Sequence, residues 1–235
     1  MVRLWRLVDL GVLDYDQALQ LQHRCVDARN LGVLDRDVFF LLEHPAVITC
    51  GRRGGTEHLC VPSSVLKAHG VRVLSVERGG SITYHGPGQL VGYPIVHLPS
   101  AGWKAVEWVT ALEEVMIRTA ARFGVKATRN TRNRGVWVGD KKLGSIGIAV
   151  RHGVSFHGFA LNVNNSLEPF GWIHPCGLEN VSVTSLALET GTMLSMIQVK
   201  ATLTACAEQV LDVRFERTDL EALYVAIGKR PDASG

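Results

Sequence analysis

Residues 136–163 read VWVGDKKLGSIGIAVRHGVSFHGFALNV, and this stretch decides the fold. It contains one short and two longer apolar runs, the longer ones being Leu143 to Val150 and Val154 to Val163. The runs are separated by Gly139-Asp140 and by Arg151-His152-Gly153. Turns this short join neighbouring antiparallel strands when β-rich segments flank them. The stretch therefore predicts an antiparallel meander.

Helical periodicity predicts three helices outside this meander. The longest runs from Trp103 to Phe123, where apolar residues recur at three- and four-residue steps. Two capping patterns, Asp14 with Gln17 and Ser195 with Gln198, open the other two helices. These helices are expected to end near residues 30 and 210, and the second is expected to be the last of the chain.

Three further apolar runs predict additional strands, at Val38 to Leu42, Val71 to Val76 and Leu90 to Leu98. Helices packed around a largely antiparallel sheet define the α+β class. We expect one domain over residues 1–228 and a frayed tail over residues 229–235. A small lobe after about Thr190 remains an alternative.

The composition is typical of a soluble globular protein, since 46% of the 235 residues are apolar and 20% are charged. The net charge of +3 is too small to indicate nucleic-acid binding by itself. We expect no secretory signal, because Arg3, Arg6 and Asp9 interrupt the first apolar residues, and no run approaches the roughly 18 apolar residues of a membrane span. We expect a cytoplasmic protein that binds neither nucleic acid nor membrane.

Five cysteines are spread along the chain, and none forms a Cys-x-x-Cys pair: Cys25, Cys50, Cys60, Cys176 and Cys206. Zinc-ribbon and thioredoxin motifs are therefore excluded. Half a metal site is conceivable where His58 and Cys60 follow Cys50, but a second close pair of ligands is missing, so we expect no metal. Free thiols in a reducing compartment are the simplest interpretation.

Cys176 is the cysteine with the most unusual setting, because Pro175 precedes it and Gly177 follows it. Proline fixes the backbone on one side and glycine frees it on the other, which presents the thiol on a turn. The alternative is a small buried hydrophobe, which is what most free cysteines are.

Residues 78–90, RGGSITYHGPGQL, are the densest candidate binding segment. Their glycine spacing matches neither the dinucleotide-binding G-x-G-x-x-G pattern nor a P-loop. A twisted β-hairpin with bulges would account for the composition without a ligand. Glycines also recur in Gly144-Ser145-Ile146-Gly147 and in His157-Gly158-Phe159-Ala160. Glycine inside a strand sacrifices packing, so three such places predict a groove for something slender, such as an acyl chain or a lysine arm.

Lys141 and Lys142 follow the turn at Gly139-Asp140. Successive residues of a strand point to opposite faces, so one of the two lysines points inward. Lys141 fits a solvated hairpin tip. We expect Lys142, which begins the apolar strand, to face the glycine-lined groove, where it is able to exchange a proton with a thiol.

Taken together, these motifs closely resemble the lipoyl(octanoyl) transferases, which transfer an octanoyl group from acyl carrier protein to protein lysines. The resemblance runs from about residue 5 to residue 190, and Thr83-x-His85-Gly86-Pro87-Gly88-Gln89 is its most specific segment. Two small departures, Cys50 and His174, do not threaten it. The other matching segments are Glu43-His44-Pro45, Gly51-Arg52-Arg53-Gly54, Arg78-Gly79-Gly80, Gly135-Val136-Trp137, Lys142-x-x-Ser145-Ile146-Gly147, Ser155-Phe156-His157-Gly158-Phe159-Ala160-Leu161-Asn162 and Pro175-Cys176-Gly177.

The resemblance implies the fold of biotin-ligase and lipoate-ligase catalytic domains, a mixed and largely antiparallel sheet packed against helices. It implies that Cys176 is the nucleophile that accepts the acyl group and that Lys142 is its partner. No cofactor is implied. The substrate groove is implied to be lined by Arg78, Gly79, Gly80, Ser81, Ile82, Thr83, Tyr84, His85, Ser145, Ile146, Gly147, Gly158, Phe159 and Ala160.

The implied partners are octanoyl-acyl carrier protein as donor, and as acceptors the lipoyl domains of 2-oxoacid dehydrogenases and the glycine-cleavage H protein. Two alternatives stay open. One is an ATP-dependent lipoate or biotin ligase of the same fold, although lipoate ligases carry a different pattern where this chain has His85-Gly86-Pro87. The other is a non-catalytic module that binds carrier proteins.

A basic segment follows Glu114, since no acidic residue occurs before Asp140 while six basic ones do: Arg118, Arg122, Lys126, Arg129, Arg132 and Arg134. A solvated helix end and loop would explain it. The functional hypothesis is that this segment steers the strongly acidic carrier protein toward the groove.

Overall fold

A computed structural model describes residues 2–130, 133–174 and 181–228. Eight strands form the main sheet, in the order β11-β1-β2-β6-β10-β9-β8-β7. β1 pairs in parallel with β11 and with β2, and the remaining neighbours pair antiparallel. The strands are β1 (Arg3–Val12), β2 (Val38–Glu43), β6 (Gln89–His97), β7 (Thr128–Arg129), β8 (Val136–Val138), β9 (Lys141–Arg151), β10 (Val154–Asn162) and β11 (Val213–Arg217).

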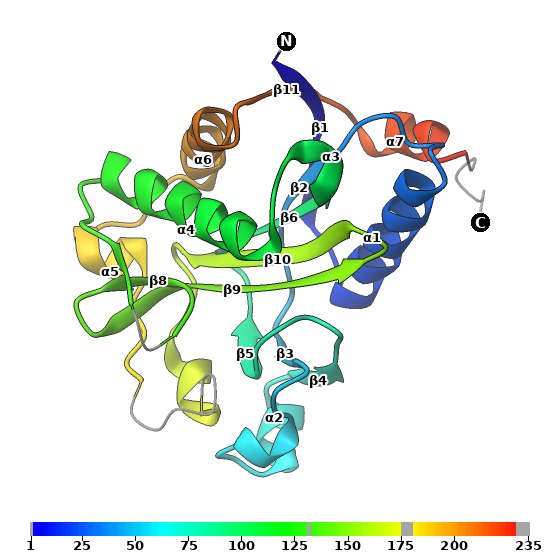
Figure 1. The fold of residues 1–235 in the computed structure, drawn as a ribbon. Coiled ribbons are helices and arrows are strands. Elements are labelled where there is room, and N and C mark those ends of the chain that lie inside the picture. The colour runs from blue at the N-terminus through cyan, green and yellow to red at the C-terminus, as the bar shows by residue number, and fades with distance from the viewer. Residues whose placement is uncertain (1, 131–132, 175–180, 229–235) are drawn as a thin grey trace.

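Helices cover both faces of this sheet, as Figure 1 shows. α4 (Ala105–Arg122) and α6 (Met196–Leu211) lie on one face, with the short α3 (Leu98–Ala101) and α5 (Leu186–Thr190) nearby. α1 (Tyr15–Asn30) and α7 (Leu220–Ala226) lie on the other. The uninterrupted apolar run of β2 follows from this, because Phe39 and Leu41 pack under α4 and α6 while Phe40 packs under α1.

A second, three-stranded sheet has the order β4-β3-β5 and lies below the main sheet in the view of Figure 1. Its strands are β3 (Val47–Cys50), β4 (Arg72–Ser75) and β5 (Ile82–His85). α2 (Ser63–Ala68) and two short 3-10 helices, η1 (Thr56–His58) and η2 (Glu168–Trp172), accompany it. Ile48, Tyr84 and Phe170 share its separate small core.

The predicted α+β class and the predicted meander are confirmed. β8, β9 and β10 pair antiparallel in sequence order, and His152 and Gly153 both have positive φ, as a two-residue hairpin turn of type I′ requires. The predicted caps are also present: Ser195 accepts from the N–H of Gln198, whereas Asp14 accepts from Asp16 rather than from Gln17.

The prediction that the helix after Ser195 is the last one is wrong. β11 follows it and pairs with β1 at the edge of the main sheet, and α7 then packs its Leu223 against the core beneath α1. The chain after Thr190 thus completes the main sheet. The predicted tail, residues 229–235, lies outside the described residues. Among the described helices, none is long and apolar enough to span a bilayer.

Candidate active site

A pocket opens where the small sheet meets β9 and β10 of the main sheet. All of the predicted groove residues except Gly79 and Tyr84 line it, and so does Lys142. Segments distant in sequence therefore come together as the resemblance implies, while their substrate-binding role stays a prediction. The lining residues are Tyr15, Arg78, Gly80, Ser81, Ile82, Thr83, His85, Tyr93, Lys142, Ser145, Ile146, Gly147, His157, Gly158, Phe159 and Ala160.

Gly79 and Tyr84, which do not line this pocket, have other partners in the structure. The N–H of Gly79 donates to the carbonyl of Ile148 at 2.8 Å, which joins the segment before β5 to β9. Tyr84 packs edge to face on Phe170, with ring centroids 5.5 Å apart, inside the small core. Treating the whole run from Arg78 to His85 as groove lining overlooked these two structural roles.

Close packing of backbone explains two of the strand glycines without any ligand. A Cβ on Gly147 would lie 2.5 Å from the carbonyl oxygen of Gly79, and one on Gly158 would lie 2.1 Å from that of Gly92. Side-chain carbons do not approach backbone oxygens this closely, so only glycine fits. These two glycines let backbone segments approach closely beside the pocket that both residues line.

Lys142 is 4% exposed and lines the pocket, whereas Lys141 is exposed and lies 3.9 Å from Glu189. The two lysines therefore point as the alternation of a strand predicts. The Lys142 ammonium also lies 5.3 Å from the ring centre of Trp137, within the range of a cation–π contact.

The backbone of Lys142 is fixed by the segment 182–184. Its N–H donates to Ser182 at 2.8 Å, and its carbonyl accepts from Thr184 at 2.9 Å. Thr184 in turn accepts from the Asn162 amide, to which Gln89 donates at 2.9 Å. The motif that ends in Gln89 is thus linked to Lys142 through buried hydrogen bonds, a role that its sequence did not reveal.

A chain of aromatic hydroxyls and imidazoles lies in and directly behind another part of the wall, and sequence reasoning missed it. His44 Nδ1 lies 2.7 Å from the carbonyl of Leu13, so this nitrogen carries the proton. His44 Nε2 then accepts from the Tyr93 hydroxyl at 2.8 Å. Tyr15 and His157, 3.5 Å apart, lie next along the wall. His44 and His157 stand in matched segments, but only the fold shows that His157 lines the pocket and that His44 contacts the lining residue Tyr93.

Burial keeps these imidazoles neutral. It lowers the pKa of His44 to about 4 and that of His157 to about 3, and it lowers the pKa of His85 well below its usual value. The Arg78 guanidinium adds to the effect at His85 and His157. Burial raises the pKa of Tyr15 to about 12. Near neutral pH this wall is therefore polar but carries no charge of its own.

Arg78 is a second buried basic residue of the pocket, beside Lys142. Its guanidinium donates to the carbonyl and hydroxyl oxygens of Thr49, at 2.7 and 2.8 Å, and to the carbonyl of Gly79 at 3.1 Å. These bonds hold the segment before β5 against β3. A buried charge is tolerated because such partners replace its water.

Cys176 and Gly177 lie outside the described residues. The chain leading toward them is anchored, because Ile173 bridges to Leu59 and the N–H of His174 donates to the carbonyl of His58 at 2.9 Å. The remaining cysteines do not line the pocket. Cys25, Cys50 and Cys206 are buried, and burial raises the pKa of the Cys25 thiol to about 12, so this thiol is unsuited to act as a nucleophile.

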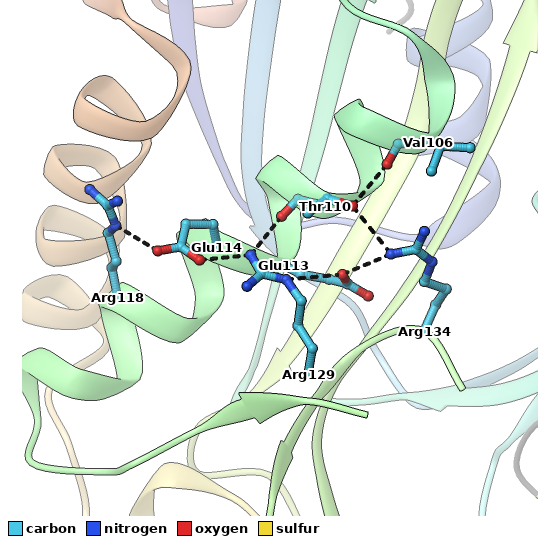
Figure 2. A network of polar contacts seen from close by, with 7 residues as sticks. All are labelled: Val106, Thr110, Glu113, Glu114, Arg118, Arg129 and Arg134. Atoms are coloured by element: carbon cyan, nitrogen blue, oxygen red, sulfur yellow. Dashed lines mark hydrogen bonds and ion pairs between the residues drawn. The ribbon is translucent and has the colours of Figure 1, made fainter. Parts of the chain in front are cut away.

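Three arginines of the basic segment are paired with acidic residues of α4 (Figure 2). Arg118 and Arg129 contact Glu114 at 2.9 and 2.7 Å. Arg134 contacts Glu113 at 3.2 Å, and Arg129 lies 3.4 Å from the same carboxylate. The segment is therefore less positive than its sequence indicates, because its own helix supplies counter-charges from residues just before it.

The chain belongs to the lipoyl protein ligase A/B catalytic domain family, whose model matches residues 14–208. The family predicted from the sequence motifs is thereby confirmed. Within it the chain is similar to proteins named octanoyltransferase. One, from Desulfotalea psychrophila, is 53% identical over 93% of this chain and 97% of its own length. Another, from Syntrophobacter fumaroxidans, is 46% identical over 85% and 87%.

Solved structures support the fold alone. A putative lipoate protein ligase from T. acidophilum with bound lipoic acid aligns with a TM-score of 0.74 at 16% identity, over 97% of this chain and 93% of that one. The biotin protein ligase from Aquifex aeolicus aligns with a TM-score of 0.50 at 11% identity, over 90% and 70%. The predicted ligase-like fold is confirmed.

Proposed function

We propose that the protein is an octanoyltransferase of lipoate biosynthesis, which moves an octanoyl group from acyl carrier protein to a lysine of lipoyl-domain proteins. The relatives named octanoyltransferase support the activity. The observation that carries the proposal is the buried Lys142 on the wall of a pocket whose lining combines glycines and apolar side chains, such as Ile146 and Phe159, with polar groups. Such a pocket suits an acyl chain, and such a lysine suits proton transfer.

Cys176 is the proposed nucleophile. An ordinary thiol has a pKa of about 8.5, so only a few per cent is thiolate at neutral pH, and a neighbouring ammonium increases that fraction. The thiolate attacks the octanoyl carbonyl and forms a new thioester. The C–S bond to the carrier's phosphopantetheine breaks, and the departing thiolate takes a proton from Lys142.

The second half of the reaction uses the same groups in reverse. A neutral lysine of the acceptor domain attacks the Cys176 thioester and forms an amide, while Lys142 accepts the proton that this amine loses. Backbone N–H groups stabilise the oxyanion in both steps. Exchange between thioesters is nearly balanced and formation of the amide is downhill, so the transfer needs no ATP.

The partners are proposed at two levels. An acyl donor and a lipoyl-domain acceptor follow from the names of the relatives and from the family. We further propose octanoyl-acyl carrier protein as the donor, and the lipoyl domains of 2-oxoacid dehydrogenases and the glycine-cleavage H protein as acceptors.

Intact mass spectrometry tests the proposal. The protein is incubated with octanoyl carrier protein and no ATP, first alone and then with a lipoyl domain. We expect one octanoyl group on the enzyme, none on Cys176→Ser, and transfer to the domain only with the native enzyme. Cys60→Ser, which removes the exposed thiol, is the matched control and should behave like the native chain. Modification of the domain only when free octanoate and ATP replace the octanoyl carrier protein would indicate a ligase, and no modification with either donor would indicate a binding module.

A further inference from the structure

We propose that Glu113 is a positioning residue, which holds Gly135 against the side chain of Lys142 and thereby keeps the ammonium directed into the pocket. The inference rests on the proposed function, because it gives Lys142 its proton-transfer role. Glu113 lies on α4, which is not part of the pocket wall, so it acts through the chain at the start of β8.

The Glu113 carboxylate is 1% exposed and accepts from the backbone N–H of Gly135 at 2.8 Å. Its other oxygen faces Arg134 at 3.2 Å and Arg129 at 3.4 Å, as Figure 2 shows. A carboxylate buried this deeply requires such donors. The two arginines balance the charge of the buried carboxylate, and its other oxygen holds Gly135 through the hydrogen bond.

Gly135 lies directly against Lys142. With φ at +122°, it adopts a backbone conformation that favours glycine, and an added Cβ would lie 3.0 Å from Lys142 Cε and 2.5 Å from the carbonyl oxygen of Gly144. The Cα of Gly135 therefore forms one side of the space in which the lysine stem lies. The Trp137 ring is a second neighbour of the same side chain.

A β-bulge sits at the same place. Val136 pairs with Gly144 but Trp137 pairs with Lys142, so Leu143 is an extra residue in β9. Bulges redirect the side chains beside them and commonly occur next to functional sites. The first residues of β8 must hold their place for this register to persist, and the Glu113–Gly135 hydrogen bond ties them to α4.

A lysine side chain has a flexible stem with several rotamers. Without the Gly135 backbone beside it, the Lys142 ammonium spends less time at the position that proton transfer requires. Small displacements of a catalytic group lower turnover strongly, on the order of 100-fold for 1 Å. The geometry thus predicts an effect on kcat rather than on substrate affinity.

Two conservative variants separate the hydrogen bond from the charge. Glu113→Gln keeps the length of the side chain and an oxygen for the Gly135 N–H, but loses the charge that pairs with the arginines. Glu113→Asp keeps the charge but is one methylene shorter, so it does not reach Gly135. Glu114→Ala is the matched control, since Glu114 contacts Arg118 and Arg129 in the same network.

We expect Glu113→Asp to lower kcat on the order of 10- to 100-fold with KM for octanoyl carrier protein nearly unchanged. Glu113→Gln should retain kcat within about threefold, and Glu114→Ala should match the native enzyme. Alkylation of the Cys176 peptide by iodoacetamide, followed against pH by mass spectrometry, gives a readout besides turnover. In Glu113→Asp its midpoint should move to higher pH, because the ammonium that favours the thiolate is displaced.

The reverse order, with Glu113→Asp active and Glu113→Gln inactive, would overturn the inference, since charge and not the contact with Gly135 would then matter. Native kinetics in both variants would overturn it too. Lys142→Ala separates this inference from the proposed function: native turnover without Lys142 would refute the lysine's proposed role, whereas an inactive Lys142→Ala beside a native-like Glu113→Asp would refute only the role of Glu113.

Discussion

Gly147→Ala should destabilise the protein and disturb the pocket, because the new methyl group has no space. It would lie 2.5 Å from the carbonyl oxygen of Gly79, about 0.9 Å closer than an ordinary van der Waals contact. The atom in the way is backbone, so the segment before β5 must move away from β9. That movement breaks the hydrogen bond from Gly79 to Ile148.

Two terms set the magnitude. Overpacking of a tightly packed site costs about 1–3 kcal/mol, and loss of one backbone hydrogen bond costs about 1 kcal/mol. The free energy of unfolding should therefore fall by about 2–4 kcal/mol, which lowers Tm on the order of 10 °C in a chain of this length. Gly79 is the residue that must move, and its neighbours Arg78 and Gly80 line the pocket. KM for the acyl donor should therefore also rise.

Urea denaturation, fitted with a common m value, measures the first effect, and steady-state kinetics measures the second. Gly171→Ala is the matched control, since no atom lies within 4 Å of its added Cβ and its φ is not positive. It should change stability by no more than about 1 kcal/mol. A Gly147→Ala variant as stable as this control would refute the explanation that the nearby carbonyl of Gly79 requires glycine at position 147.

Three other predictions concern charged groups. Lys142→Ala should slow alkylation of the Cys176 thiol near neutral pH, while Lys141→Ala should not. Identical profiles of alkylation rate against pH for the two variants would contradict the proposal that Lys142 is the partner of Cys176. Folding lowers the pKa of His44 from about 6.5 to about 4. The free energy of unfolding is therefore at its full value above about pH 6.5. Between pH 6.5 and pH 4 it falls by about 1.4 kcal/mol for each pH unit, because the unfolded chain binds a proton that the folded one does not. The free energy of unfolding, measured by urea titration between pH 7 and 5, should depend less steeply on pH in His44→Gln by that amount. An unchanged dependence on pH would contradict the burial of His44 as a neutral imidazole. Arg122→Glu with Lys126→Glu should raise KM for octanoyl carrier protein more than for octanoyl-CoA, with rising salt removing the difference, and equal effects on both donors would exclude steering by these exposed side chains.

The sequence predicted those parts of the site that depend on local pattern. The meander followed from apolar runs separated by short turns, and the inward Lys142 followed from the two-residue period of a strand. The cap at Ser195 followed from a residue pair three apart. Each of these signals lies within about thirty residues.

The missed parts depend on contacts between distant segments. Glu113 and Gly135 looked like an ordinary helix carboxylate and a loop glycine until the fold placed one against the other. The basic segment looked unpaired because its partners precede it on α4. β11 and α7 were missed because their apolar pattern is short, and pairing with β1 supplies the stability that the pattern lacks.

The pairing of β1 with β11 has a consequence for biosynthesis. Residues 3–7 are synthesised about 210 residues before residues 213–217, their partner on one side. Until those residues emerge, the nascent sheet has an open strand edge, and such edges promote association between chains. The closing strand also joins positions about 210 residues apart, a long-range contact of the kind that slows folding. The open edge therefore persists until residue 217 has been made, and a ribosome stalled before residue 213 should display a nascent chain prone to aggregate.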